Sequence, residues 1–282
     1  MNRAAFDIIP EEGLDDQIQQ STLLMEIGEN YFRYIIYDKH TQKIWGLRQY
    51  HFDISPDKPV LEYLHDLLQN DKYLAEPVKD SMVIYNYCDC CLLPEQYFHV
   101  ESNKPIIELI YGNAHKGLIL SEKIKGWDLC TVYRVPREIH TLLQQRFSAG
   151  KYWHFYSLWL SQLDRKSMQM PVVHAIFYTD KFFVTVFDKN TVMLMQSYSY
   201  QTPEDVVYYL LSICKNLDLD PEKVPLHLSG LVDKDSALFH ELYKYFLFVE
   251  YANMPEKVHT NGLFAEIPSH YFSPIMKLAL CV

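Results

Sequence analysis

The sequence contains little glycine, with 9 residues in 282. This scarcity limits one class of site, because loops that wrap phosphate groups need glycines whose backbone N–H groups can approach the phosphate oxygens closely. The chain also lacks an excess of basic residues: 26 Lys and Arg stand against 36 Asp and Glu, for a net charge of −10. Nucleic acids and anionic membrane surfaces attract dense basic faces, so we expect neither as a partner.

Long apolar runs are missing as well. No stretch approaches the roughly 20 consecutive apolar residues of a membrane-spanning helix, so we expect no membrane insertion. The first residues include acidic side chains where a secretion signal would have an apolar core. The six cysteines do not reach the density of a small disulfide-stapled domain. Together these features predict a cytoplasmic protein with reduced thiols.

Familiar site motifs are also absent. The sequence has no Gly-x-x-x-x-Gly-Lys-Ser/Thr phosphate loop, no Gly-x-Ser-x-Gly nucleophile elbow and no His-Glu-x-x-His zinc helix. Cys88, Cys90 and Cys91 form a cluster that suggests a zinc site. Zinc usually takes about four N or S ligands from two spaced pairs, and no second pair follows. We therefore expect no metal and treat these cysteines as small apolar residues; a cysteine-based metal protein is the alternative.

The strongest pattern that is present is a repeat. Residues 171–246 have the same order of parts as residues 21–98: three β segments joined by tight turns, a helix, a fourth buried strand and a short segment that ends in Tyr-Phe. A repeat of roughly 75–80 residues is too long for a solenoid unit, so it predicts two similar subdomains. The matching positions are Tyr31–Trp45 and Lys181–Met195, Asp38 and Asp188, and Tyr50 and Tyr200.

Periodicity and turn residues predict the individual elements. The predicted strands are 23–27, 31–37, 43–52, 81–87, 118–124, 129–135, 225–229 and 247–251. The predicted helices are 60–68, 137–147, 152–163, 236–245, 273–280 and one that begins after Thr202. That last helix has the clearest start, because Thr202 can cap it, Pro203 fits its first position and Asp205 lies three residues after the cap.

The same patterns predict the domain organisation. We expect a polar lead-in over residues 1–20, a first subdomain with an insertion over residues 21–165, and a second subdomain over residues 166–282. The polar run at 164–169 is the expected crossing between the two halves.

Three antiparallel strands, a crossover helix and a parallel fourth strand, duplicated in one chain, resemble the actin / sugar-kinase / chaperone ATPase superfamily. The resemblance implies an α/β fold of two ribonuclease-H-like subdomains, each with a mixed sheet begun by a three-stranded antiparallel meander. Superfamily members normally clasp ATP between the two subdomains. More closely, the chain is similar to a small family of uncharacterised bacterial proteins with this fold, distantly similar to the actin-like proteins of pilus-biogenesis machines.

The resemblance implies a phosphate loop of the Asp-x-Gly type in the first hairpin of each copy. There, glycine admits the phosphate to the backbone, and the carboxylate holds the hydration shell of Mg²⁺ or orients the attacking water. In the first copy Glu26 takes the place of the aspartate and Gly28 matches the glycine. In the second copy Ile176 lies opposite Glu26 and Tyr178 opposite Gly28, so both the acid and the glycine are missing.

The candidate cofactor-binding residues are therefore Gly28 and Asn30 in the first hairpin and Gly230, which supplies one glycine of the expected adenosine-binding turn. Simpler interpretations exist for two of the positions. Gly28 can be an ordinary turn residue with a positive φ, and Glu26 can be a strand-end carboxylate that faces solvent or the cleft.

Two hypotheses follow. The first is an actin-like protein without catalytic activity, a scaffold or adaptor with a degenerate nucleotide cleft that binds a protein segment and no cofactor. The second is an ATP-binding enzyme, an ATPase or a kinase, whose acids are Glu26, Glu29 and Asp180. The low glycine content favours the first hypothesis and disfavours binding of ATP with Mg²⁺.

Overall fold

The computed structural model describes residues 4–10, 14–55, 58–76, 78–113, 117–163 and 169–281, which form two compact units. The first unit contains Met1–Ser161, Glu256–Glu266 and Leu278–Val282. The second contains Gln162–Pro255 and Ile267–Lys277. Residues 164–168 of the expected crossing lie outside the described residues, so the boundary after residue 165 stays a prediction.

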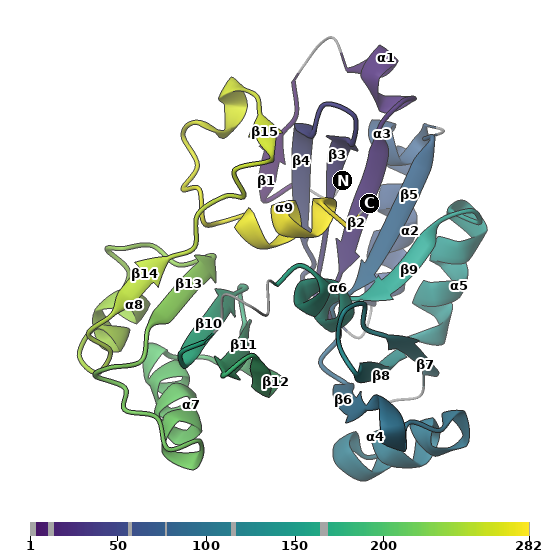
Figure 1. The fold of residues 1–282 in the computed structure, drawn as a ribbon. Helices are drawn as coiled ribbons and strands as arrows, with labels where there is room; N and C mark the ends of the chain where they lie inside the picture. The colour runs from purple at the N-terminus through teal and green to yellow at the C-terminus, as the bar shows by residue number, and fades with distance from the viewer. Residues whose placement is uncertain are drawn as a thin grey trace. The chain divides into compact units, whose positions relative to one another are not determined.

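The first unit is built on a mixed sheet (Figure 1). Strands β2 (Thr22–Ile27), β3 (Tyr31–Asp38) and β4 (Lys43–His51) form an antiparallel meander. Strands β5 (Asp80–Tyr85) and β9 (Lys151–His154) continue the sheet in parallel, which gives the order β4-β3-β2-β5-β9. Every residue of β2 is buried, as expected for a sheet that is covered on both faces.

Two helices make the crossovers of this sheet. Helix α2 (Val60–Asn70) leads from the meander to β5, and helix α5 (Arg137–Arg146) leads into β9. The apolar stripe predicted for the first helix is present, with Leu64, Leu67 and Leu68 buried. The two helices lie side by side (Figure 1), as parallel crossovers on one face of a sheet do.

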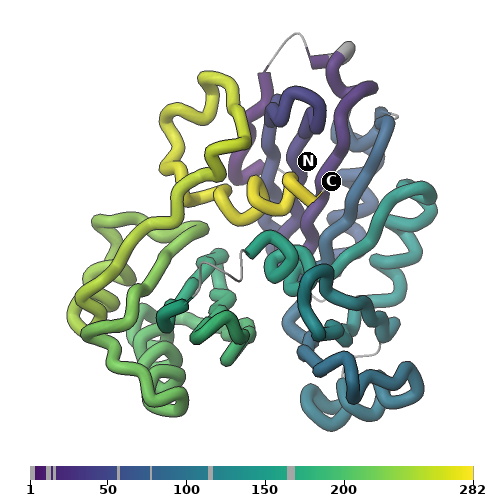
Figure 2. The backbone as a smooth tube through the Cα atoms, in the orientation of Figure 1, coloured from purple at the N-terminus to yellow at the C-terminus, as the bar shows by residue number. Residues whose placement is uncertain are grey.

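Further strands extend the free edge of β4. Strand β1 (Phe6–Ile8) pairs with it in an antiparallel manner, and the two-residue strand β15 (His259–Thr260) pairs with it in parallel. Figure 2 shows how the yellow C-terminal part of the chain thus joins the sheet that the purple N-terminal strands begin. Part of the expected polar lead-in is therefore an edge strand.

The second unit repeats this arrangement. Its strand order, β12-β11-β10-β13-β14, corresponds position by position to β4-β3-β2-β5-β9, with the same strand directions. The predicted duplication is confirmed. The elements are β10 (Val172–Phe177), β11 (Lys181–Asp188), β12 (Thr191–Ser199), α7 (Pro203–Asn216), β13 (Leu226–Gly230), α8 (Ala237–Leu242) and β14 (Val249–Tyr251).

Both meanders contain a β-bulge at the same place. It falls between Ile36 and Tyr37 in the first copy and between Val186 and Phe187 in the second. The hairpin that follows differs in length, because Asp38 pairs with Lys43 across four loop residues whereas Asp188 pairs with Thr191 across two. The two-residue loop has positive φ at Lys189 (46°) and Asn190 (63°), which is typical of a type I′ turn.

This difference corrects one expected match between the copies. Tyr50 lies opposite Phe32, and the equivalent residue opposite Phe182 is Tyr198. The match of Tyr50 with Tyr200 is therefore wrong by two residues, which is the difference in loop length. The earlier match of Asp38 with Asp188 is correct.

An insertion separates β5 from α5 in the first unit. Strands β6, β8 and β7 form a three-stranded antiparallel sheet in that order, and helix α4 packs against it. The first copy thus does not end at Phe98, because its fifth strand, β9, comes only after the insertion. The inserted elements are β6 (Cys90–Pro94), η1 (Glu95–Tyr97), η2 (Val100–Ser102), α4 (Asn103–Tyr111), β7 (Leu118–Lys123) and β8 (Leu129–Val135).

The aromatic stretch 152–163 was predicted to be entirely helical, and this prediction is partly wrong. Residues up to His154 belong to β9, and helix α6 (Phe155–Ser161) begins only afterwards. Pairing of β9 with β5 outweighs the local preference here, since Tyr152 lies opposite Val83 in the sheet.

Both units also contain short helices. They are α1 (Asp15–Ile18), α3 (Lys72–Ala75), η4 (Gly262–Phe264) and α9 (Ser273–Ala279). Within the described residues, none of the helices combines the length and the apolar character that a bilayer crossing requires.

The start of α7 provides a test of the local physics. Thr202 accepts a hydrogen bond from the backbone N–H of Asp205 at 3.3 Å, and the Asp205 carboxylate accepts the N–H of Thr202 at 2.9 Å, so the predicted cap is a complete capping box. We expect Thr202→Ala to lower the free energy of unfolding by about 1 kcal/mol in urea titrations. The exposed neighbour Gln201, changed to Ala, is the control. Equal losses would show that the cap does not stabilise the helix.

Candidate functional site

The first hairpin, between β2 and β3, contains the candidate glycine. The N–H of Gly28 donates to the carbonyl oxygen of Tyr31 at 3.1 Å. A Cβ atom added to Gly28 would lie 2.3 Å from Cε1 of the Tyr31 ring. The expectation of a positive φ is wrong, since Gly28 is not among the glycines with that conformation. Glycine is required here because an aromatic ring packs on it, and this ring covers the backbone that a phosphate would have to approach.

Glu26 is fully buried, so the expectation that it faces solvent or a cleft is wrong. Its Oε1 accepts hydrogen bonds from Tyr31 Oη at 2.6 Å and Asn86 Nδ2 at 2.8 Å. Its Oε2 accepts two from Arg33, from Nε at 2.9 Å and from a terminal guanidinium nitrogen at 2.6 Å. Each carboxylate oxygen is therefore already bound to the protein twice.

These partners fix the charge of the group. Burial alone would raise the pKa of Glu26, but the positive charge of Arg33 and the hydrogen bonds from Tyr31 and Asn86 lower the pKa below its ordinary value. The carboxylate is ionised and forms a buried ion pair with Arg33, whose side chain is also buried. A role in holding hydrated Mg²⁺ would require this ion pair to open.

The other two candidates in this hairpin bind backbone groups. Glu29 is half-buried, and its Oε1 accepts the N–H of Cys88 at 2.7 Å. Asn30 is half-buried as well, and its carbonyl oxygen accepts the N–H of Phe52 at 2.7 Å. Both residues thus join the hairpin to neighbouring segments of the first unit.

The second hairpin has the same backbone geometry and different side chains. The N–H of Tyr178 donates to the carbonyl oxygen of Lys181 at 2.9 Å, as Gly28 does to Tyr31. The Tyr178 side chain is buried, and Lys181 Nζ lies 5.6 Å from the centre of its ring. Ile176 pairs with Phe183 where Glu26 pairs with Arg33, so an apolar pair takes the place of the ion pair. Asp180 lies in the turn and is exposed.

Gly230 ends β13 with a φ of 81°. A Cβ atom there would lie 2.1 Å from the carbonyl oxygen of Phe177, so no other residue fits without a shift of the strands. The N–H of Gly230 donates to the carbonyl oxygen of His270 at 2.9 Å, and that of Leu231 to Phe177 at 2.9 Å. The turn expected to contact adenosine is therefore closed by hydrogen bonds within its own unit.

Two cysteines of the cluster, Cys90 and Cys91, belong to strand β6. Cys90 is buried in β6, and burial raises its pKa well above the ordinary value; burial also raises the pKa of Cys91 to about 11. Across the described ranges, no three His, Cys, Asp or Glu side chains are grouped so that they could hold a metal ion. The raised pKa values show that Cys90 and Cys91 are not activated as nucleophiles.

The partners of Glu26 are not among the residues that the sequence predicts for the site. A signal for Arg33 was available, because a lone cation inside the apolar strand Tyr31–Tyr37 needs a buried partner, and the hairpin places Glu26 directly opposite. Asn86 has no comparable signal, since it reaches Glu26 only through the parallel pairing of β5 with β2.

A second missed acid is Glu122 on β7. Its Oε1 accepts the N–H of His154 at 2.7 Å, and its Oε2 accepts the hydroxyl of Tyr133 at 3.3 Å. Burial raises the pKa of Glu122 to about 7. The carboxyl group joins the inserted sheet to β9, a contact between segments 32 residues apart that no local pattern indicates.

Two glycines with the same φ of 81° allow a matched test of the closed turn, since a Cβ atom at Gly126 would meet nothing within 4 Å. We expect Gly126→Ala to lower the free energy of unfolding by about 1–2 kcal/mol, the cost of a left-handed alanine. Gly230→Ala should cost about 2 kcal/mol more, because β10 and β13 must move apart. Urea unfolding measures both, and equal losses would contradict the close approach to Phe177.

The buried ion pair generates a second test. Glu26→Gln leaves the Arg33 guanidinium buried without a counter-charge, so we expect the free energy of unfolding to fall by about 3 kcal/mol. Glu29→Gln is the matched control, because it keeps an acceptor for the Cys88 N–H and should cost less than about 1 kcal/mol. A Glu26→Gln protein that melts at the original temperature would show that the pair does not support the fold.

Comparison with known proteins agrees with this fold. A protein with an actin-like ATPase fold and unknown function from Bacteroides thetaiotaomicron superposes with a TM-score of 0.78 at 16% identity, over 95% of this chain and 99% of that one. The PilM–PilN type IV pilus biogenesis complex superposes with a TM-score of 0.59 at 10% identity, over 94% of this chain and 98% of the matched chain. No curated protein sequence matches the chain.

The strand order in both units and these superpositions establish an actin-like ATPase fold, with the duplicated ribonuclease-H-like arrangement that the sequence predicts. One family model matches residues 13–249, most of the chain, and its description is "Protein of unknown function (DUF3822)". The chain belongs to the DUF3822 family.

Proposed function

We propose that this protein is a scaffold or adaptor without catalytic activity, an actin-like fold whose nucleotide site is degenerate. The observation that carries the proposal is the state of the two hairpins. A tyrosine ring packs on Gly28 in the first, and a buried tyrosine replaces the glycine in the second. Bound polyphosphate needs open backbone N–H groups at these positions, and neither hairpin offers them.

The acids support the same conclusion. Phosphoryl transfer depends on a metal ion and on a group that orients the nucleophile. Glu26 is ionised and paired with Arg33, and Glu29 binds the backbone of Cys88. Asp180 is exposed, but the β10 residue at the place of Glu26 is Ile176, so the second hairpin lacks a companion acid there. An ATP-dependent enzyme that uses these three acids is therefore the weaker proposal.

A role in protein binding fits one structural neighbour of this chain. One matched chain comes from the PilM–PilN type IV pilus biogenesis complex, so that protein is part of an assembly of proteins. We place the protein in the cytoplasm as part of the proposal, because six cysteines among 282 residues do not reach the density of a disulfide-stapled secreted domain.

Isothermal titration of the full chain with ATP and Mg²⁺ tests the proposal. We expect no measurable heat, which corresponds to a Kd weaker than about 1 mM. The reason is that binding would have to displace the Tyr31 ring in one unit and Tyr178 in the other. Low-micromolar binding accompanied by release of phosphate would overturn the proposal. Loss of that turnover in a Glu26→Gln protein that keeps the original melting temperature would then identify Glu26 as the acid.

A further inference from the structure

A groove runs between helices α2 and α5 on the outer face of the first unit's sheet. Its wider part has a volume of about 630 Å³ and lies between the N-terminal halves of the two helices. A second part of about 380 Å³ continues toward their C-terminal ends. His65, Leu142 and Gln145 line both parts, so the two form one continuous groove, which we call the α2–α5 groove.

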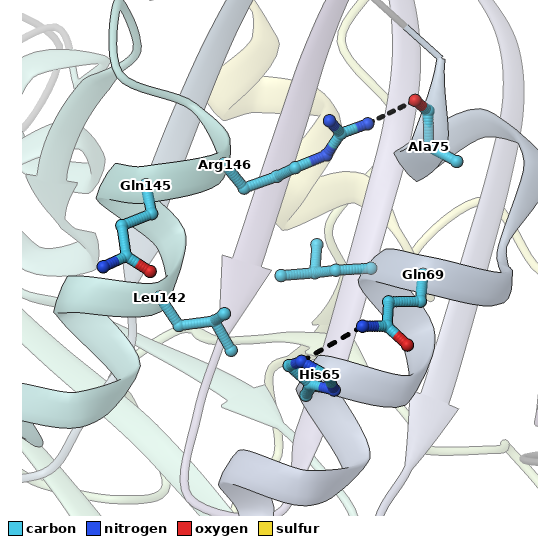
Figure 3. A pocket seen from close by; sticks show the side chains of 7 residues that line it. His65, Gln69, Ala75, Leu142, Gln145 and Arg146 are labelled. Carbon is cyan, nitrogen blue, oxygen red and sulfur yellow. Dashed lines mark hydrogen bonds between the residues drawn. The ribbon is translucent and has the colours of Figure 1, made fainter.

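The floor of the α2–α5 groove is apolar. Leu68 is buried there, and Leu61 and Leu142 are half-buried. Figure 3 shows Leu142 projecting from α5 into the space between the helices, opposite the pair formed by His65 and Gln69 on α2. Along α2 the lining extends from Leu61 to Gln69, a rise of about 12 Å or roughly two helical turns.

The rim of the wider part is acidic. Glu62 and Asp66 on α2 and Glu138 on α5 line it, and all three are exposed. Among the described residues that line this part, Arg137 is the single Lys or Arg. Lys58 approaches Asp66 at 3.5 Å, but both side chains are exposed, and such a pair is weak enough to be replaced by a partner.

The α2–α5 groove is preformed. The Arg146 guanidinium donates to the carbonyl oxygen of Leu74 from Nε at 3.1 Å and from a terminal nitrogen at 2.8 Å, and it also donates to that of Ala75. The bond to Ala75 is drawn in Figure 3. These bonds fasten the C-terminal end of α5 to α3, so a partner finds the groove in place and need not order it.

We propose that the α2–α5 groove binds a basic amphipathic helix of a protein partner, an inference that rests on the proposed scaffold function and names its binding surface. Leucine-like side chains at i, i+3/i+4 and i+7 cover the two turns of apolar floor, and lysines or arginines beside them face the acidic rim. The charge of the rim selects the basic helix over an acidic one.

Synthetic 16-residue peptides test the proposal by fluorescence anisotropy with the full chain. The first peptide carries leucines on one helical face and lysines on the other. The second has the same composition in a scrambled order, and the third replaces every lysine with glutamate. We expect the first to bind at least about tenfold more tightly than the other two. The scrambled peptide is the decisive control, because a protein of charge −10 attracts any cation weakly.

Variants then locate the binding. Thr141→Trp fills the wider part of the groove from its rim and should reduce affinity at least about tenfold, whereas Gln144→Trp places the same ring at an exposed position of α5 outside the lining. The double variant Glu62→Gln, Glu138→Gln removes two negative charges from the rim and should weaken peptide binding. The double variant Glu222→Gln, Asp235→Asn removes two negative charges from exposed positions of the second unit and should leave peptide binding unchanged. Thermal melting confirms that each variant is folded.

Equal binding of the first and scrambled peptides, or unchanged binding in Thr141→Trp, would overturn the proposal. So would a concentration-dependent dimer that Thr141→Trp dissociates, which would assign the groove to a second copy of the chain. The ATP titration separates the two ideas. If the protein binds neither ATP nor the peptides, the proposed scaffold role stands and the α2–α5 groove is not its binding surface. If the protein hydrolyses ATP and also binds the first peptide, the groove stands as a binding surface and the proposal of an inactive protein is wrong.

Discussion

The buried pairing of Glu26 with Arg33 is the constraint on which the first unit's hairpin depends. Two charges without water are stable only when their remaining hydrogen-bonding positions are filled, and Tyr31 and Asn86 fill them here. The same Tyr31 side chain that donates to Glu26 also lays its ring on Gly28. One network therefore engages the ionised carboxylate in an ion pair and covers the backbone beside the glycine. A phosphate loop needs both the carboxylate and that backbone to be accessible.

The second unit reaches a closed hairpin by a different route. Its backbone bond from Tyr178 to Lys181 repeats that of the first hairpin, but an apolar pair, Ile176 and Phe183, replaces the ion pair. Apolar residues in such a position need no polar partners. The second hairpin therefore has neither the buried acid nor the arginine that pairs with it in the first. The two copies have kept the strand order, the bulge and the hairpin geometry while their side chains diverged. The two copies thus share a backbone arrangement, and the side chains at the two hairpins differ.

Helices α2 and α5 of the first unit form a groove. Parallel crossovers bring the N-terminal halves of α2 and α5 together, and this direction gathers Glu62, Asp66 and Glu138 around an apolar floor. The sequence shows these acids only as scattered charges on two helices about 75 residues apart. The sheet that both helices cover holds them side by side, and this arrangement makes one groove of two ordinary amphipathic helices.

The sequence by itself determined the duplication, the meander followed by a crossover helix and a parallel strand, and the capped start of α7, because each depends on residues close together in the chain. Only the tertiary structure decided that 152–154 pair with β5, that β1 and β15 extend the sheet, and that Glu26 is buried rather than open. These outcomes depend on pairing between distant segments, whose register follows from loop length and packing. A two-residue difference in one loop moved the equivalent of Tyr50 from Tyr200 to Tyr198, and local residue patterns do not fix which distant strand or side chain completes a buried site.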